Sequence, residues 1–234
     1  MKTVGIIPAR YNSSRIINKP LIKINNKTLI QCTYEAVIDA KIFDSVYLTT
    51  DSKKIQRVAE SFGGQCIITS KKHRNGTERC AQVIKSIGDI DAEDLIVNIQ
   101  CDEPYLKKIH FKKILSLFEK NVEIGTLICP LNDDEIKDSS VVKVKINNEN
   151  CAKYFKRKVI KENKLYKHIG VYAYKTKTLQ QICQLPVLEK EINQSLEQLR
   201  WLLSGYKIYC ALIKDNLTSI NTYEDIKKIT KKSL

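Results

Sequence analysis

The sequence predicts an α/β protein built on a doubly wound, mostly parallel sheet. Short apolar runs rich in Ile and Val alternate with stretches in which apolar residues repeat at helical spacing. The apolar runs are hydrophobic throughout, as expected for strands that helices cover on both faces. With 234 residues, 43% hydrophobic and 28% charged, the chain has the size and composition of one large globular domain.

The first half of the chain shows four strand–helix units. Strands are predicted at 3–8, 45–50, 65–70 and 95–100, and helices at 29–40, 55–62, 80–87 and 111–118. Gly63 and Gly64 end the second helix as a C-cap. Because ligands of such sheets bind beyond the carboxyl ends of the strands, we expect a site in the loops that follow these strands.

The second half of the chain is less regular. Strands are predicted at 141–146, 168–174 and 207–213, and helices at 195–203 and from Tyr223 onward. The polar segment between the first two of these strands is expected to be irregular or a hairpin. With no internal repeat or linker in the sequence, we predict a single domain over 1–234 with a hairpin or dimerisation excursion around 147–167.

Composition narrows the classes of partner. The net charge is +14, but the lysines are scattered and no basic run is interleaved with aromatic residues, so we expect no nucleic acid as partner. A basic surface instead attracts small anions such as phosphates and carboxylates. The longest apolar runs are too short for a membrane span or a signal peptide, so we predict a cytoplasmic protein without a membrane partner. Eight cysteines without a C-x-x-C pair indicate reduced core thiols.

The loop after the first strand reads PARYNSSRIINKPL. It carries the cations of Arg10, Arg15 and Lys19 and the hydroxyls of Ser13 and Ser14. Such a loop can hold a polyphosphate through its cations and backbone N–H groups, although it lacks the Walker A pattern. Taken alone, it is equally consistent with a solvated basic loop.

A second basic loop, KKHRNGTER, follows the third strand. Gly76 permits close approach of the backbone to a ligand. Thr77 and Glu78 can cap the next helix, whose N-terminus favours anions. Taken alone, this loop is better explained as an ordinary turn with an N-cap.

The fourth strand ends in QCDEP. Asp102 lies at its carboxyl end, facing the basic loops, where a carboxylate is a natural Mg²⁺ ligand. The alternative is that Asp102 is a helix N-cap ahead of Pro104. We expect Asp102 to serve the metal, and Glu103 and Pro104 to start the next helix.

The motifs occur together in the order and spacing of a known family. The chain resembles the 3-deoxy-manno-octulosonate (Kdo) cytidylyltransferases, which make CMP-Kdo for lipopolysaccharide biosynthesis, over essentially its whole length. The segments that carry the resemblance are IIPARYNSSRIINKPL, TTD, FGG, HRNGTER, VNIQCDEP, YFKR, HIGVYAY, LEQLR and INTYEDI. The first loop and the QCDEP strand end recur in related sugar nucleotidyltransferases, whereas YFKR, HIGVY and LEQLR point to the Kdo enzyme. The resemblance implies a three-layer α/β/α sandwich with a mixed sheet, like that of the nucleotide-diphospho-sugar transferases, and a homodimer.

The resemblance also implies the reaction and the residues that perform it. CTP would donate its cytidylyl group to the anomeric hydroxyl of Kdo and release pyrophosphate, with Mg²⁺ as cofactor. The implied catalytic residues are Arg10, Arg15, Lys19 and Asp102. The implied nucleotide-binding residues are Pro8, Ser13, Ser14, Asn75, Gly76, Thr77 and Arg79. The implied sugar-binding residues are Gln100, Arg157, His168, Tyr172, Glu197 and Gln198, with Arg157 suited to the sugar carboxylate, and the implied metal ligands are Asp102 and Asn221.

The chain departs from the family pattern within three of these motifs. Ile17 and Asn18 replace the Pro-Gly of L-P-G-K-P-L, and because Asn tolerates a positive φ we expect the turn to survive. Cys101 replaces the glycine of V-Q-G-D-E-P. If that glycine serves the close approach of a ligand, a thiol intrudes there, and Cys101 needs a conventional β or bridge φ/ψ. Asn221 replaces the second Asp of V-D-T-P-E-D-L and Tyr223 a proline, which predicts weaker metal binding.

Two alternatives remain open at this level. The sugar could be another acidic one, such as an amino-substituted Kdo or a nonulosonate. Alternatively, the substitutions at Asn18, Cys101 and Asn221 could leave a nucleotide-binding homologue that has lost catalysis. The segment at 161–167 is shorter than in the family, which leaves the substrate lid and the dimer interface undetermined.

Overall fold

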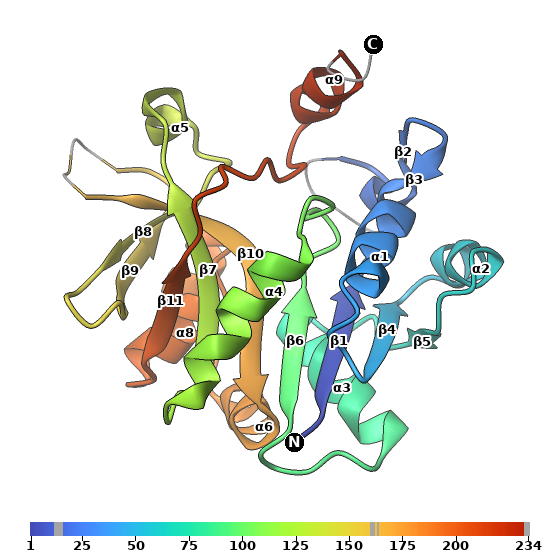
Figure 1. Cartoon of the computed structure of the whole chain (residues 1–234), viewed down its shortest axis with the longest axis horizontal. Helices are drawn as coiled ribbons and strands as arrows, with labels where there is room; N and C mark the ends of the chain where they lie inside the picture. The colour runs from blue at the N-terminus through green and yellow to red at the C-terminus, as the bar shows by residue number, and fades with distance from the viewer. Residues whose placement is uncertain (12–15, 160–161, 163, 232–234) are drawn as a thin grey trace.

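The computed structural model describes residues 1–11, 16–159, 162 and 164–231, and shows one mixed sheet between two layers of helices (Figure 1). Within the described residues the central strands lie in the order β11-β7-β10-β6-β1-β4-β5. Their bounds are β1 Thr3–Pro8, β4 Ser45–Thr50, β5 Cys66–Ile68, β6 Leu95–Ile99, β7 Ile124–Pro130, β10 Tyr166–Lys175 and β11 Ile208–Leu212. The architecture confirms the predicted three-layer α/β/α fold.

Strand direction decides which ends meet at the site. Neighbouring strands β6, β1, β4 and β5 run parallel, as do β7 and β11, whereas β10 runs antiparallel to both β6 and β7. The beginning of β10 therefore lies at the same edge of the sheet as the carboxyl ends of β1, β4 and β6 (Figure 1).

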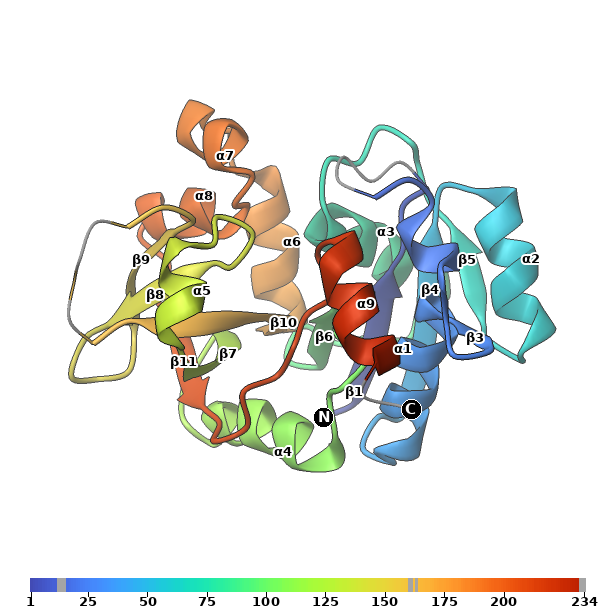
Figure 2. The same cartoon turned by 90° about the horizontal axis from the view of Figure 1, so that it is seen from above.

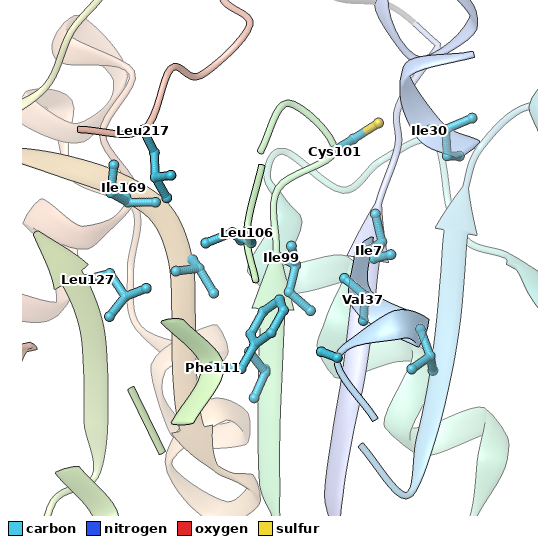
Figure 3. Close-up of a cluster of buried hydrophobic side chains, with 14 of the residues drawn as sticks. Ile7, Ile30, Val37, Ile99, Cys101, Leu106, Phe111, Leu127, Ile169 and Leu217 are labelled. Atoms are coloured by element: carbon cyan, nitrogen blue, oxygen red, sulfur yellow. The ribbon is translucent and has the colours of Figure 1, made fainter. Parts of the chain in front are cut away.

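Each face of the sheet carries a hydrophobic core under its own helices. One core joins the sheet to α1 (Leu29–Asp39), α2 (Lys53–Ser61) and α4 (Lys108–Leu115), as the buried side chains in Figure 3 show in part. The other joins it to α3 (Gly76–Ile87), α6 (Thr176–Gln184) and α8 (Gln198–Leu203), seen from above in Figure 2. Thr28, Ser52 and Asn75 cap α1, α2 and α3 by accepting a backbone N–H three residues on.

The remaining elements extend from the edges of this sandwich. β8 (Lys143–Ile146) and β9 (Ala152–Lys156) form an antiparallel hairpin, and β8 also pairs with the start of β10. The shorter elements are η1 Lys19–Leu21, β2 Lys23–Ile24, β3 Lys27–Thr28, η2 Ser116–Glu119, α5 Asp133–Lys137, α7 Glu189–Gln194 and α9 Tyr223–Lys231. The hairpin turn accounts for the beginning of the predicted excursion at 147–167.

The structure corrects two predicted helix starts. α4 begins at Lys108 after an N-cap at Lys107, so Glu103 and Pro104 do not start it. The cap of α3 is Asn75 and not Thr77 or Glu78. β1, β4 and the start of α9 match the predictions to the residue, whereas β7, α6 and α7 were not predicted.

All eight cysteines are free thiols, as predicted. Among the described residues, no helix is long and apolar enough to cross a membrane.

Candidate active site

The first loop and the end of β6 meet in a close ion pair. The Lys19 ammonium lies 2.5 Å from Oδ2 of Asp102, and the two side chains are only 12% and 16% exposed. Asn18, just before Lys19, adopts the left-handed conformation with φ of 54°, as a glycine would. The asparagine therefore preserves the turn that presents Lys19, as predicted.

Other predicted residues of the first loop are placed only in part. Arg10 is exposed just beyond β1, and Pro8 ends that strand. Ser13, Ser14 and Arg15 lie outside the described residues.

Asp102 is also held through its backbone. Its carbonyl accepts the N–H of Ile220 at 2.9 Å, which brings Asn221 next to the Asp102 segment. The backbone N–H groups of Asn221 and Thr222 in turn donate to Asp225 of α9, both at 2.8 Å. The described residues contain no group of three or more His, Cys, Asp or Glu that could hold a metal ion by itself.

Cys101 does not intrude on the site. Its side chain is buried in the hydrophobic core beneath the loop, and in Figure 3 its sulfur points toward the side of α1 that carries Ile30. Its backbone is not among the positive-φ positions of the described chain, and its carbonyl accepts the Thr33 hydroxyl at 2.7 Å. The backbone therefore has the conventional φ that was predicted as necessary, and the thiol does not intrude because the side chain turns inward.

Glu103 has a structural role, but not the predicted one of starting a helix. Its Oε1 accepts the backbone N–H of Gly170 at 2.9 Å and the hydroxyl of Ser219 at 2.6 Å. Burial and the neighbouring charge of Asp102 raise the pKa of this carboxyl. Glu103 thereby ties the end of β6 to β10 and to the segment that leads to Asn221.

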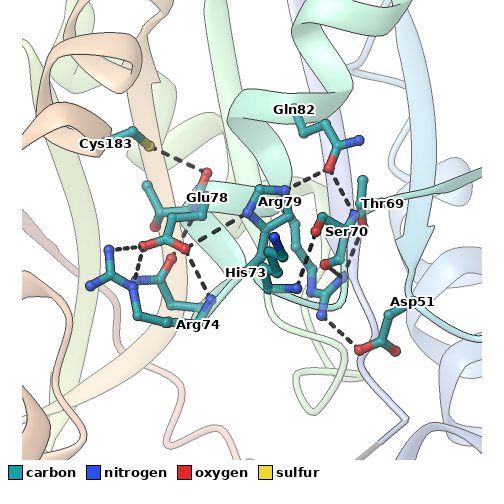
Figure 4. Close-up of polar contacts among 12 residues, drawn as sticks. Asp51, Thr69, Ser70, His73, Arg74, Glu78, Arg79, Gln82 and Cys183 are labelled. Carbon is teal, nitrogen blue, oxygen red and sulfur yellow. Dashed lines mark hydrogen bonds and ion pairs between the residues drawn. The ribbon is translucent and has the colours of Figure 1, made fainter.

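A second polar cluster surrounds the N-terminus of α3 (Figure 4). Asn75 accepts the N–H of Glu78 at 2.9 Å, while Glu78 binds the Arg74 guanidinium at 2.6 Å. Gly76 packs so closely that an added Cβ would lie 3.2 Å from Pro8, which joins this helix end to the end of β1. The lack of a side chain at Gly76 therefore permits close packing against Pro8, whereas the predicted approach of a ligand stays a prediction.

The Arg79 side chain points away from Glu78 and Arg74, toward the ends of β4 and β5. Its guanidinium is buried and donates to Oδ2 of Asp51 at 2.8 Å and to the Thr69 hydroxyl at 2.8 Å. Figure 4 shows Arg79 and Glu78 reaching in opposite directions from α3. Asp51 was not predicted as a site residue, although TTD places it directly after a strand.

Thr77 links α3 to the predicted sugar-binding residues. Its hydroxyl lies 3.3 Å from the Tyr174 hydroxyl and accepts from the Asn98 amide at 3.4 Å. Thr77 also hydrogen-bonds Glu197, and burial raises the pKa of that carboxyl to about 7.

Several buried polar atoms in this region have no hydrogen-bond partner among the described residues. They are Asn75 Nδ2, Asn98 Oδ1, Tyr172 Oη and Glu197 Oε2. Buried polar atoms are nearly always satisfied in folded proteins, so these four atoms are available to bind water or a ligand.

His168 is held as a neutral ring at the start of β10. The Thr126 hydroxyl donates to the carbonyl of Val171 at 2.7 Å and therefore accepts from Nε2 of His168 at 3.0 Å. Burial, together with the charge of Arg157, lowers the pKa of His168 to about 3. The ring packs 5.1 Å from that of Tyr172, whose other side meets Trp201 edge-on.

Arg157 lies near His168 but binds backbone carbonyls. Its Nε donates to Gln194 at 2.9 Å and its terminal nitrogens to Ser140 and Ser195 at 3.2 and 3.3 Å. Gln198 is buried at the start of α8, and the N–H of Gln100 donates to the Gly170 carbonyl at 2.9 Å. The predicted sugar-binding residues thus come from the ends of β6, β9 and β10 and from α8.

Comparison with known proteins shows the family and the fold of the chain. The sequence profile of the cytidylyltransferase family matches residues 4–208. A 3-deoxy-manno-octulosonate cytidylyltransferase of Parabacteroides distasonis is 41% identical over 97% of this chain and 96% of its own. An 8-amino-3,8-dideoxy-manno-octulosonate cytidylyltransferase of Shewanella frigidimarina is 39% identical over 97% of each chain. The solved structure of a CMP:2-keto-3-deoxy-manno-octonic acid synthetase complexed with CTP superimposes with a TM-score of 0.88 at 31% identity, covering 100% of this chain and 98% of that one.

Proposed function

The chain belongs to the 3-deoxy-manno-octulosonate cytidylyltransferase family, and we infer from this that it transfers the cytidylyl group of CTP to Kdo. The anomeric hydroxyl oxygen of the sugar forms a bond to the α-phosphorus, the bond from that phosphorus to the β-phosphate oxygen breaks, and pyrophosphate leaves. Such a transfer depends on positioning and charge neutralisation more than on covalent chemistry by the protein. The observation that best supports this function in the structure is the Lys19–Asp102 pair at the carboxyl end of β6.

The residues of the first loop fit the triphosphate. Arg10 and Lys19 would neutralise its charge and stabilise the departing pyrophosphate, together with Arg15 of the segment that is not described. Gly76 and the unpartnered amide of Asn75 lie where the nucleoside would rest against the N-terminus of α3. In this proposal Asn75, Gly76 and Thr77 contact the nucleotide, whereas Arg79 supports it from beneath.

Mg²⁺ is part of the proposal. This ion is usually held by one or two carboxylates together with substrate phosphates and water, so Asp102 with the amide oxygen of Asn221 would fit it. When bound, the ion would act as a Lewis acid on the phosphate oxygens. Lys19 would then exchange its contact with Asp102 for the phosphates.

The sugar half of the site is proposed to recognise an acidic polyol. Neutral His168 keeps Nδ1 as an acceptor for a sugar hydroxyl, because Nε2–H is engaged by Thr126. Arg157 would turn from its backbone carbonyls toward the sugar carboxylate. The remaining predicted contacts are Gln100, Tyr172, Glu197 and Gln198.

The test is pyrophosphate release by the purified chain with CTP, Mg²⁺ and Kdo. We expect release that requires all three components, with CMP-Kdo as the second product. CTP binding without release would instead support the homologue that has lost catalysis, and binding to DNA but not to CTP would contradict both hypotheses.

The 8-amino sugar is the second candidate substrate, because a relative with that printed name is nearly as similar as the Kdo enzymes. Turnover of Kdo and of 8-amino-Kdo by the same preparation decides between them. A higher kcat/KM for Kdo is expected, and the reverse order would assign the chain to the amino sugar.

A homodimer and a cytoplasmic location complete the proposal. The β8–β9 hairpin projects beside the sheet, where it is available to a second copy (Figure 1). Light scattering should give twice the chain mass of 26.9 kDa. A monomer in the presence and absence of CTP would contradict this part of the proposal.

A further inference from the structure

Asp51 joins the first loop to α3 through a continuous chain of polar contacts. Its Oδ1 accepts the backbone N–H of Tyr11 at 3.0 Å, and its Oδ2 accepts from the Arg79 guanidinium at 2.8 Å. Arg79 also donates to Thr69 Oγ1, which lies 2.9 Å from the Thr49 hydroxyl. The contacts therefore connect the residues just beyond β1, β4 and β5 with the first turns of α3. Figure 4 shows the part that joins Asp51 and Thr69 to Arg79.

The ion pair of Arg79 and Asp51 is buried, so each charge depends on the other. The side chains of Arg79 and Asp51 are 3% and 15% exposed, so neither charge is well solvated. A buried guanidinium that loses its carboxylate partner is strongly destabilising, whereas removal of both charges is often tolerated. Asp51 uses both oxygens, and an amide at this position could accept from only one of its two donors at a time.

The two ends of this series of polar contacts lie at the two proposed parts of the nucleotide site. Tyr11 lies between Arg10 and the residues Ser13, Ser14 and Arg15, which belong to the proposed triphosphate loop. Arg79 lies one helical turn from Asn75 and Gly76, at the proposed nucleoside end. We propose that Asp51 is a positioning residue that keeps the backbone of Tyr11, next to Arg10 of the proposed triphosphate site, in register with the N-terminus of α3; this inference rests on the proposed function.

The test separates the Tyr11 contact from the buried charge. Asp51→Asn/Arg79→Met removes both charges but keeps an oxygen that can accept from Tyr11, whereas Asp51→Ala/Arg79→Met removes the acceptor as well. We expect the alanine variant to have a KM for CTP up to about tenfold higher than that of the asparagine variant, as for one lost hydrogen bond between neutral groups. The KM for Kdo is expected to change less than twofold (about 0.4 kcal/mol).

A single variant and a matched control complete the design. Asp51→Asn alone should raise the KM for CTP about tenfold, and the added Arg79→Met should restore it to within about threefold of wild type. The matched control is Asp44, which also accepts a backbone N–H, that of Thr3 at 2.6 Å. Because Thr3 lies at the opposite end of β1, Asp44→Asn should leave both KM values unchanged. Thermal unfolding and calorimetric CTP binding are measured on every variant.

The outcomes are distinct. Equal KM values for CTP in the two double variants overturn the positioning role of Asp51. No recovery on addition of Arg79→Met overturns it too, because Arg79 would then contact the nucleotide directly. A wild-type chain without CMP-Kdo synthesis would instead overturn the proposed function, and the calorimetric CTP affinities would still test the positioning role.

Discussion

At Asp102, one carboxylate serves a lysine 2.5 Å away and, in our proposal, a metal ion. In the same proposal Asn221 would contribute an amide oxygen without charge, and the charge of the ligands sets the affinity of a divalent-ion site. Asn221→Asp should therefore lower the Mg²⁺ concentration for half-maximal turnover by about tenfold. Mn²⁺ binding followed by electron paramagnetic resonance with CTP present measures the same change without turnover.

The control for this prediction is Asn121→Asp. It adds the same charge on an exposed residue before β7, at the far end of the sheet. If the Asn221 variant and this control have the same Mg²⁺ requirement and the same Mn²⁺ affinity, Asn221 lies outside the metal site.

Glu197 predicts a pH dependence of stability. Its pKa is raised from 4.5 in the unfolded chain to about 7 in the folded one, so the folded state holds the proton more tightly. The stability contributed by the protonated form is complete below pH 4.5 and is lost as the pH rises through 7. Glu197→Gln removes this loss. The free energy of unfolding of the variant, relative to that of wild type, should therefore rise by on the order of 3 kcal/mol between pH 4.5 and pH 8.

Urea unfolding of both proteins at the two pH values measures this gain. The control is Glu189→Gln, which makes the same change at an exposed position on α7 and should shift stability equally at both pH values. A difference between wild type and Glu197→Gln that is the same at both pH values would contradict a raised pKa.

Single residues show where sequence reasoning succeeds and fails. The left-handed turn at Asn18 was predictable because backbone conformation is a local property of the residue type. The inward turn of Cys101 was not, because the direction of a side chain after a strand depends on the pocket that α1 offers. The same holds for Arg79, whose type suggested a ligand contact and whose burial under α3 gave it Asp51 instead.

At the scale of elements, β6 and β10 are packed too closely for a side chain at Gly170. A Cβ there would lie 2.9 Å from both Oε1 of Gln100 and Oε1 of Glu103. Gly170→Ala should displace both side chains and cost about 1–3 kcal/mol of unfolding free energy. The KM for the sugar should rise as well, because Gln100 is one of its proposed ligands.

Urea unfolding and steady-state kinetics check this prediction. Ser219→Ala, which removes only the hydroxyl bond to Glu103, should cost less, about 1 kcal/mol. If Gly170→Ala were as stable as wild type, the close packing of Gln100 and Glu103 on this strand would be refuted.

Local signals explain which elements were predictable. The four strand–helix units of the first half were recognised because each buries a continuous apolar run. β7 also has such a run and could have been found. The start of α4 was hidden because its cap is Lys107 with His110, a pair outside the usual capping residues. The helices α6 and α7 are short and polar enough that tertiary packing decides them.

At the scale of the whole molecule, the net charge of +14 should assist the capture of an anionic nucleotide. The ratio kcat/KM for CTP is therefore expected to fall about threefold to tenfold when NaCl is raised from ~50 mM to ~500 mM. Turnover at saturating CTP should change less. A ratio independent of salt would show that the scattered lysines do not steer the substrate.

The whole site could be predicted only as a list of motifs. Their order along the chain indicated one family, but contacts such as Ser219 with Glu103 join residues 116 positions apart. No local pattern encodes such pairings, because they arise when the sheet brings strand ends together. Asp51, Glu103 and Gly170 therefore emerged only from the folded structure.

The reversed strand β10 has a consequence for the synthesis of the chain. β6 pairs with β1 on one side, but its other neighbour is β10, which ends at Lys175. At about 5–20 residues per second, the roughly 75 residues after Ile99 take about 4–15 s to emerge. During that time a strand that is apolar except for Asn98 presents an open hydrogen-bonding edge, which invites pairing with other nascent chains. The yield of the folded protein is thus expected to depend on how well chaperones on the ribosome protect this edge.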